Sequence, residues 1–251
     1  MSVTGEGPDR PPVKCGPPVT DITAGLLATM GVLAATIERN KTGKGQRVDT
    51  SLFEAGITQT FWQSAIALAT GVSPTPMGSA HPLNAPYEAF QTANGWLTLG
   101  AASQVIWQRL PNVLGLPELL SDSRFLQNED RMAHRAALAD ALAPAFKKRS
   151  TNDWLERLDA AGVPAGPVLS VGEMLADPQT KAREMLVETE HQRLGPVPTI
   201  GFPVKFSETP AAIERGAPTL GQHTTEVLRE LGYADSDIDK LVADSVVIRG
   251  D

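Results

Sequence analysis

The sequence predicts an α/β protein in which a small α+β domain is inserted between two parts of a larger domain. A long apolar stretch near the amino end has the periodicity of a helix, and a hairpin signal further along is followed by several amphipathic helices. Stretches rich in Gly and Pro flank the hairpin and its helices. We therefore expect a large-domain segment over residues 1–70, a linker or loop over 71–86, the small α+β domain over 87–175, and a linker with the return to the large domain over 176–251.

One long helix dominates the amino-terminal part, and it follows a loop over Met1–Pro18. Two prolines precede the helix, Thr20 or Asp21 can serve as its N-cap, and Gly43 with Gly45 can end it in a left-handed turn. Its apolar residues recur at a spacing of three and four, which predicts a helix face buried in a core: Leu26, Leu27, Met30, Leu33, Ala34 and Ile37.

The elements after this helix follow from alternation, helical periodicity and turn residues. An Asn-Gly turn between two short alternating runs is a strong hairpin signal. In order, we expect a strand over Arg47–Leu52, a helix over Ser51–Thr70, a loop over Gly71–Pro86, and hairpin strands over Tyr87–Gln91 and Trp96–Leu99.

The rest of the chain continues with amphipathic helices and a proline-broken strand region. We expect helices over Gln104–Leu114, Asp130–Lys147 and Asn152–Ala161, an extended segment after Gly162, short helices over Val171–Met185, strands within Leu186–Phe206, and final helices over Gln222–Leu231 and Ser236–Leu241.

Composition narrows the function classes. The chain has 251 residues and a net charge of −7, and no dense basic run offsets that charge, so we expect no nucleic-acid partner. By inspection, no apolar run approaches the length of a membrane span, and the first residues lack a signal-peptide pattern. We therefore expect no membrane partner and a cytoplasmic location. Cys15 is the single cysteine, and no His pair has a carboxylate at ligand spacing, so we expect no metal site.

Asp21 is the candidate functional residue of the long helix. By spacing alone, a carboxylate at a helix start is most often a cap worth ~1 kcal/mol. Gly25 follows one turn later, where the backbone could approach a ligand. Gly43-Lys44-Gly45-Gln46 is similar to a phosphate cradle, but its place at a helix end favours a C-cap and turn.

Four motifs in order resemble the class III CoA-transferase family of CaiB/BaiF type, which includes formyl-CoA, carnitine and succinate-dependent CoA-transferases. The motifs are PPVTDITAGLLATMGVLAATIERNKTGKGQRVDTSLFEA, GSAHPLNAPYEAFQTANGWLTLGA, GVPAGPV and GQHTTEVLRELGY. The resemblance implies that Asp21 is the catalytic nucleophile and that residues 1–70 carry it in a partial, Rossmann-like large domain. It also implies an interlocked dimer, as in relatives.

The resemblance further implies transfer of CoA from an acyl-CoA to a free carboxylic acid through an aspartyl-CoA thioester on Asp21. Coenzyme A would then be part of a substrate, with no permanently bound cofactor. Gly25, Gly78 and Ser79 are the candidates for contacting CoA, the last two because a glycine-bearing loop covers the nucleophile in the family. A plain interdomain linker is the alternative for that loop, and His81 within it is either an exposed polar residue or a group that approaches the incoming acid.

Two other functions stay open. An α-methylacyl-CoA racemase would need a supporting Glu where this chain has Ser103, and a hydroxyl cannot replace that carboxylate. A truncated, non-catalytic relative or subunit is the third reading, because the family's amino-terminal part has no counterpart here. We therefore expect a misassigned start, a fragment, or a homodimer or partner chain that supplies that part. The motifs are most similar to the dicarboxylate-using branch of the family.

Overall fold

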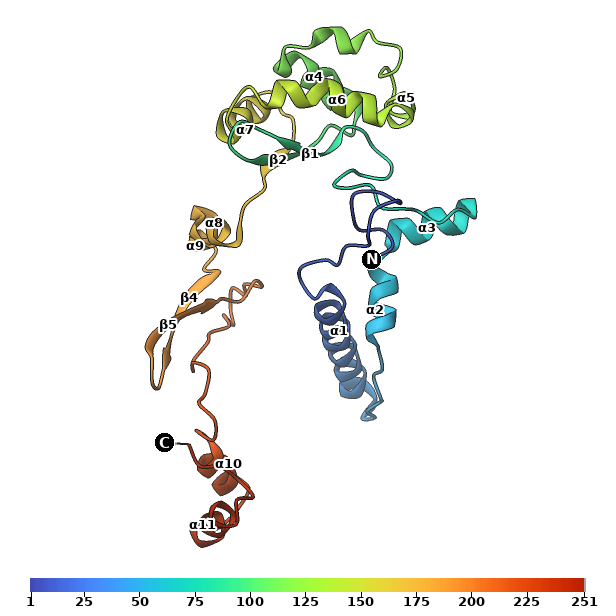
Figure 1. Ribbon diagram of the computed structural model, residues 1–251. Helices are drawn as coiled ribbons and strands as arrows, with labels where there is room; N and C mark the ends of the chain where they lie inside the picture. Colours follow the sequence, from blue (N-terminus) through green and yellow to red (C-terminus); the bar gives the residue numbers. More distant parts are fainter. Residues whose placement is uncertain (251) are drawn as a thin grey trace. The chain divides into compact units, whose positions relative to one another are not determined.

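The computed structural model describes residues 1–250. These residues form two compact units, Met1–Val168 and a second unit that begins at Leu169, and each is described by itself. Figure 1 labels the helices and strands in chain order. The mixed composition of helix and sheet agrees with the expected α/β class.

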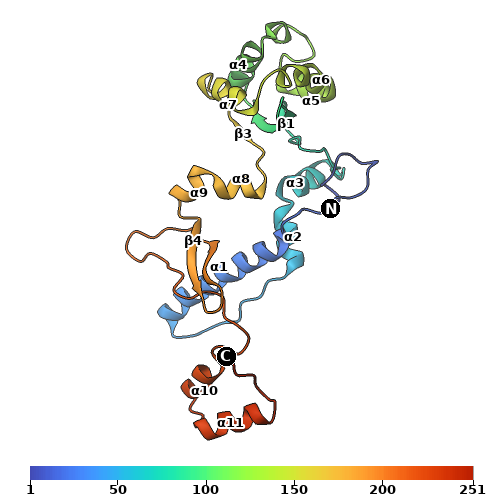
Figure 2. The ribbon, with the colours of Figure 1, turned by 60° about the vertical axis from the view of Figure 1, so that its left-hand side comes forward.

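Three helices form the amino-terminal part of the first unit: α1 (Val19–Thr42), α2 (Leu52–Gln59) and α3 (Phe61–Thr70). Helices α1 and α2 lie side by side in Figures 1 and 2. A Cβ atom on Gly31 would lie 2.7 Å from Val48 Cγ1, so this glycine lets the segment before α2 pack closely against α1. Gly43 ends α1 in the left-handed conformation, with φ 72°, which confirms the predicted C-cap.

Two expectations for α1 are wrong. Its N-cap is Pro18 without a side-chain hydrogen bond, so neither Thr20 nor Asp21 caps the helix. None of its residues is buried, because the rest of the first unit leaves its apolar face uncovered. The large apolar side chains that this face exposes are Ile22, Leu26, Met30, Leu33 and Ile37.

Helix α1 also corrects the expectation about membrane-span length. By length and composition it is long and apolar enough to cross a membrane. One such helix is weak evidence for a membrane protein, because core helices of soluble proteins pass the same test.

Two further elements differ from their predictions in this region. Residues 47–51 form no strand, since no other strand among the described residues pairs with them. The predicted helix over Ser51–Thr70 is broken into α2 and α3 at Thr60, whose hydroxyl donates to the carbonyl of Ile57 at 2.8 Å.

The hairpin forms as predicted. Strands β1 (Tyr87–Gln91) and β2 (Trp96–Gly100) pair antiparallel, with Tyr87 opposite Gly100 and Gln91 opposite Trp96. Strand β3 (Ala165–Pro167) pairs antiparallel with β2 on its other side, so β1 is a free edge of this sheet.

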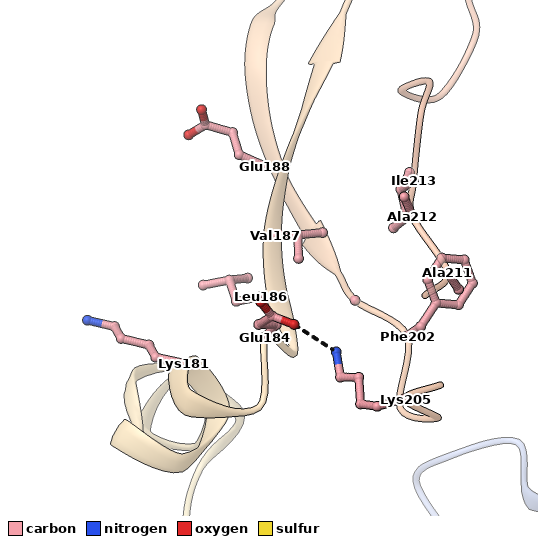
Figure 3. Close-up of a pocket in the computed structure, with 11 residues that line it drawn as sticks. Lys181, Glu184, Leu186, Val187, Glu188, Phe202, Lys205, Ala211, Ala212 and Ile213 are labelled. Atoms are coloured by element: carbon pink, nitrogen blue, oxygen red, sulfur yellow. Dashed lines mark ion pairs between the residues drawn. The ribbon is translucent and has the colours of Figure 1, made fainter. Parts of the chain in front are cut away.

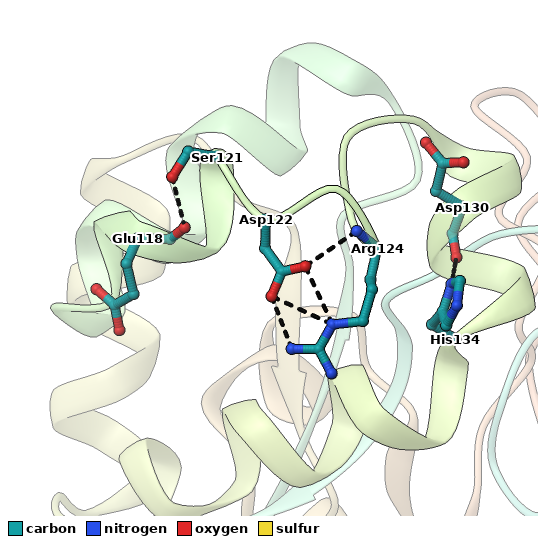
Figure 4. Close-up of polar contacts among 6 residues, drawn as sticks. All are labelled: Glu118, Ser121, Asp122, Arg124, Asp130 and His134. Carbon is teal, nitrogen blue, oxygen red and sulfur yellow. Dashed lines mark hydrogen bonds and ion pairs between the residues drawn. The ribbon is translucent and has the colours of Figure 1, made fainter.

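Helices between β2 and β3 complete a compact module. They are α4 (Gln104–Leu114), a 3-10 turn η1 (Pro117–Leu120), α5 (Asn128–Ala133), α6 (Arg135–Phe146) and α7 (Thr151–Ala160). The predicted helix over Asp130–Lys147 is thus two helices that meet at His134, whose Nδ1 lies 2.9 Å from the carbonyl oxygen of Asp130. Figure 4 shows this contact beside the Asp122–Arg124 ion pair, in the stretch that leads into α5.

Most buried residues of the chain belong to one cluster within this module, between Ala85 and Val163. Its centre is aromatic: the ring of Phe146 lies 4.8 Å from that of Phe90 and 5.5 Å from that of Trp154, centroid to centroid. Arg131 is fully buried in the same module.

The second unit holds two short helices, a hairpin and two final helices. They are α8 (Val171–Ala176), α9 (Pro178–Ala182), β4 (Leu186–His191), β5 (Gly195–Ile200), α10 (Thr224–Glu230) and α11 (Asp235–Ala243). Both sheets of residues 1–250 are antiparallel. The four-part domain division stays a prediction, as does the return of the carboxy-terminal segment to α1.

Candidate functional site

Asp21 lies in the first turn of α1, as its third residue. The side chain is exposed, and its one hydrogen bond among the described residues comes from the neighbouring Thr20 hydroxyl, which donates to Oδ2 at 3.2 Å. The positive end of the helix dipole favours a negative charge at this place. Asp21 therefore combines a favourable position for a carboxylate with no capping role and no ion-pair partner in the residues described.

The end of α2 lies against this turn. Gln59 Nε2 donates to Thr23 Oγ1 at 2.9 Å, and a Cβ on Gly56 would lie 3.5 Å from the Thr20 methyl group. Gln59 was not a sequence candidate, because a contact across 36 residues leaves no local signal. The two helices thus hold the surroundings of Asp21 through one hydrogen bond and one close packing contact.

Gly25 lies one turn after Asp21 on a similar face of α1. A Cβ atom at this position would meet nothing within 4 Å, so the surface here is open. Its carbonyl oxygen already accepts a hydrogen bond from Thr29 Oγ1 at 2.8 Å. The role of Gly25 in contacting a ligand stays a prediction.

The loop that carries Gly78 and Ser79 is fixed at two places. Gly78, with φ 65°, donates its N–H to the carbonyl of Gly5 at 2.8 Å. Ser79 Oγ accepts the backbone N–H of Ala89 at 3.0 Å, on the free edge of β1. No hydrogen bond joins Asp21 to either residue in the part of the chain described, so the structure does not bring these candidates together.

His81 lies between two aromatic rings. Its ring is stacked on Tyr87 with centroids 5.0 Å apart and meets Trp62 edge-on at 4.8 Å. Its Nδ1 accepts the N–H of Leu83 at 3.1 Å, which places the imidazole proton on Nε2 in the neutral form. Burial lowers the pKa of this histidine below its usual value, which favours that neutral form.

The cavities of the second unit hold none of these candidates. One of them, of about 480 Å³, lies beside β4 and the residues that follow β5, and is shown in Figure 3. Lys205 pairs with Glu184 there at 3.6 Å, and apolar side chains such as Val187 and Phe202 line the rest. Among residues 1–250, no group of three His, Cys, Asp or Glu side chains is arranged to hold a metal ion.

Comparison with known proteins gives one consistent family. The description "CoA-transferase family III" matches residues 1–224. This chain belongs to CoA-transferase family III.

Proteins named as CoA-transferases are similar to nearly the whole of this chain. The succinate–glutarate CoA-transferase of Agrobacterium fabrum is 36% identical over 92% of this chain and 58% of its own. The acetyl-CoA:oxalate CoA-transferase of Acetobacter aceti is 37% identical over 94% and 60%. The chain thus spans between half and two thirds of the length of these relatives.

A solved structure has the same fold. A CaiB/BaiF family protein from Brucella suis superposes with a TM-score of 0.78 at 37% identity, over 92% of this chain and 60% of its own. A Mycobacterium tuberculosis protein, at 22% identity and a TM-score of 0.75, shares the fold over 90% of this chain and 59% of its own.

Proposed function

We propose that this chain takes part in transfer of CoA from an acyl-CoA to a free carboxylic acid, with Asp21 as the nucleophile. The observation that carries the proposal is an exposed carboxylate in the first turn of α1 that neither caps the helix nor pairs with a cation of the described residues. Family membership supports the reaction class. Because the chain spans only part of its relatives' length, the activity is proposed for the assembly that contains it.

The reaction needs no metal and no base to activate the nucleophile. An Asp21 oxygen attacks the thioester carbonyl, the carbon–sulfur bond breaks, and CoA leaves as a thiolate with a mixed anhydride on the enzyme. The thiolate attacks the aspartyl carbonyl, which releases the first acid as a carboxylate and leaves an aspartyl-CoA thioester. The carboxylate of the second acid attacks the carbonyl of this thioester, the carbon–sulfur bond breaks, and CoA leaves again as a thiolate with a new anhydride on Asp21. The thiolate then attacks the acyl carbonyl of the new anhydride, which forms the new acyl-CoA and releases the Asp21 carboxylate.

The site would also have to stabilise negative charge and exclude water from the anhydride. Gly25, Gly78 and Ser79 are proposed to contact the CoA substrate. A homodimer or a partner chain would complete the site, and a cytoplasmic location suits CoA chemistry.

A short dicarboxylic acid is the proposed acceptor. Relatives are named for succinate, glutarate, oxalate, citramalate and mesaconate, which are all small dicarboxylates. Ser103 argues against the racemase alternative, because its Oγ accepts the N–H of Ile106 as the cap of α4 and no carboxylate replaces it.

Mass spectrometry of the competent assembly tests the nucleophile. Incubation with succinyl-CoA should add CoA to the peptide that contains Asp21, and hydroxylamine should remove it. Asp21→Asn keeps the size but removes the nucleophile, so turnover should fall by at least about a thousandfold, or ~4 kcal/mol of transition-state stabilisation.

Asp237→Asn is the matched control. Asp237 is likewise the third residue of a helix, α11, and is exposed. Both substitutions remove a favourable helix-dipole interaction of about 0.3–1 kcal/mol, so they should lower stability alike while only the first stops transfer. Normal turnover in Asp21→Asn would refute the mechanism.

A further inference from the structure

The loop before β1 ends in a small network that the proposed reaction does not use. Asn128 and Arg131, both in α5, reach back across more than 40 residues to residues 83–85. Asn128 Oδ1 accepts the N–H of Ala85 at 3.2 Å, and its Nδ2 donates to the carbonyl of Leu83 at 2.9 Å. One amide side chain thus satisfies both a backbone donor and a backbone acceptor of the loop.

Arg131 holds the same segment from within the core. Its side chain is fully buried, its Nε donates to the carbonyl of Ala85 at 2.6 Å, and its Nη1 donates to the carbonyl of Phe125 at 3.2 Å and to Gln104 Oε1 at 3.1 Å. The guanidinium carbon also lies 4.9 Å from the ring centroid of Trp107. No carboxylate among the described residues pairs with this cation, so carbonyl oxygens and a π-face replace a counter-ion.

Residues 79–81, which precede the segment held by Asn128 and Arg131, are bound to strand β1. The N–H of His81 donates to the carbonyl of Tyr87 at 2.9 Å, and Ser79 accepts from Ala89 one pleat further along β1. Residues 79–81 therefore run along the free edge of the sheet. His81 in turn accepts the N–H of Leu83, which is the residue that Asn128 holds.

We propose that Asn128 and Arg131 are positioning residues that make the stretch Ser79–Pro86 a fixed wall of the small module and hold the His81 ring between Trp62 and Tyr87. In this arrangement the stretch held by α5 and β1 begins at Ser79, and Gly78 before it donates its N–H to the carbonyl of Gly5. The inference rests on the proposed function in one respect, namely that this loop borders the CoA-transferase site.

Asn128→Ala is the main test, because it removes both contacts to the loop. Asn128 is the first residue of α5 while Gln127 is its N-cap, so the helix keeps its capping box. The chain has four histidines, and His81→Gln identifies the His81 signal in an NMR titration. In Asn128→Ala, the pKa of His81 should rise toward 6.5, because the ring is no longer held in its partly buried place.

Hydrogen exchange gives a second readout. The substitution removes the two hydrogen bonds of Asn128 to the loop, so local opening should cost less free energy. The amides of His81 and Ala89 should therefore exchange about tenfold faster in Asn128→Ala. Asn112→Ala is the matched control, because Asn112 is exposed and its side chain, among residues 1–250, bonds only the carbonyl of Gln108 in its own helix. It should change neither readout.

A conservative variant keeps the test decisive if Asn128→Ala does not fold. Asn128→Asp retains an acceptor for Ala85 but cannot donate to Leu83, so it should produce a smaller change of the same sign. An unchanged His81 pKa and unchanged exchange in a folded Asn128 variant would overturn the inference, as would equal changes in Asn112→Ala. Neither readout depends on turnover, so failure of the Asp21 mechanism would remain a separate result.

Discussion

Phe146 is the residue whose loss should cost the small module most. Its side chain is fully buried at the end of α6, between the rings of Phe90 and Trp154. Phe→Ala in a core costs about 3–5 kcal/mol, and each aromatic pair adds about 0.5–1.5 kcal/mol beyond area burial. We expect Phe146→Ala to lose at least about 4 kcal/mol, a large share of the ~5–15 kcal/mol that stabilises an ordinary domain.

Urea unfolding followed by tryptophan fluorescence and circular dichroism measures this loss. With a slope of about 2 kcal/mol per M, the midpoint should fall by about 2 M in Phe146→Ala. Phe146→Leu keeps most of the volume and should lose less than half as much. Val105→Ala, an exposed change on α4, should stay within about 0.5 kcal/mol. A midpoint for Phe146→Ala within about 0.3 M of the parent would show that the aromatic cluster is not the centre of stability.

Three further outcomes are expected. A hydrogen bond from Arg124 lowers the pKa of Asp122 to about 2. The contribution of Asp122 to folding stability should therefore be present above pH 3.8 and be lost as the pH falls toward 2. Arg124→Gln should raise the Asp122 pKa in an NMR titration. Burial raises the pKa of Glu88, and the positive charge of Arg135 opposes this shift. The protein should therefore lose folding stability as the pH rises above 4.5, because the unfolded state releases the Glu88 proton first. Glu88→Gln should flatten that part of the pH–stability curve. Because the apolar face of α1 is exposed, the purified chain should associate with itself or with a partner. Met30→Glu should lower the mass measured by light scattering toward that of the monomer. A parent chain that is a cooperatively folded monomer would contradict this prediction.

Local patterns predicted those elements whose signals are complete within a few residues. The hairpin of β1 and β2 and the bounds of α4 follow from alternation, an Asn-Gly turn and a three-and-four repeat. The cap at Gly43 follows because a glycine tolerates the left-handed conformation there. The position of Asp21 at the start of a helix was likewise readable, and its family motif was readable with it.

Other features depend on contacts between distant segments, which no local pattern contains. The predicted strand before α2 is absent because a strand needs a paired neighbour, and the predicted burial of α1 is absent because burial needs a covering surface. The break at His134 and the cation of Arg131 inside the core are decided by tertiary packing, in which α6 lies against β1 and Arg131 donates to the carbonyl of Ala85. By itself, the sequence determined the periodic elements and the carboxylate of the site. Only the tertiary structure decided that this carboxylate is not a cap and that the loop of His81 is held by α5. Both results depend on which groups the folded chain places within reach of each side chain, and a local pattern does not contain that information.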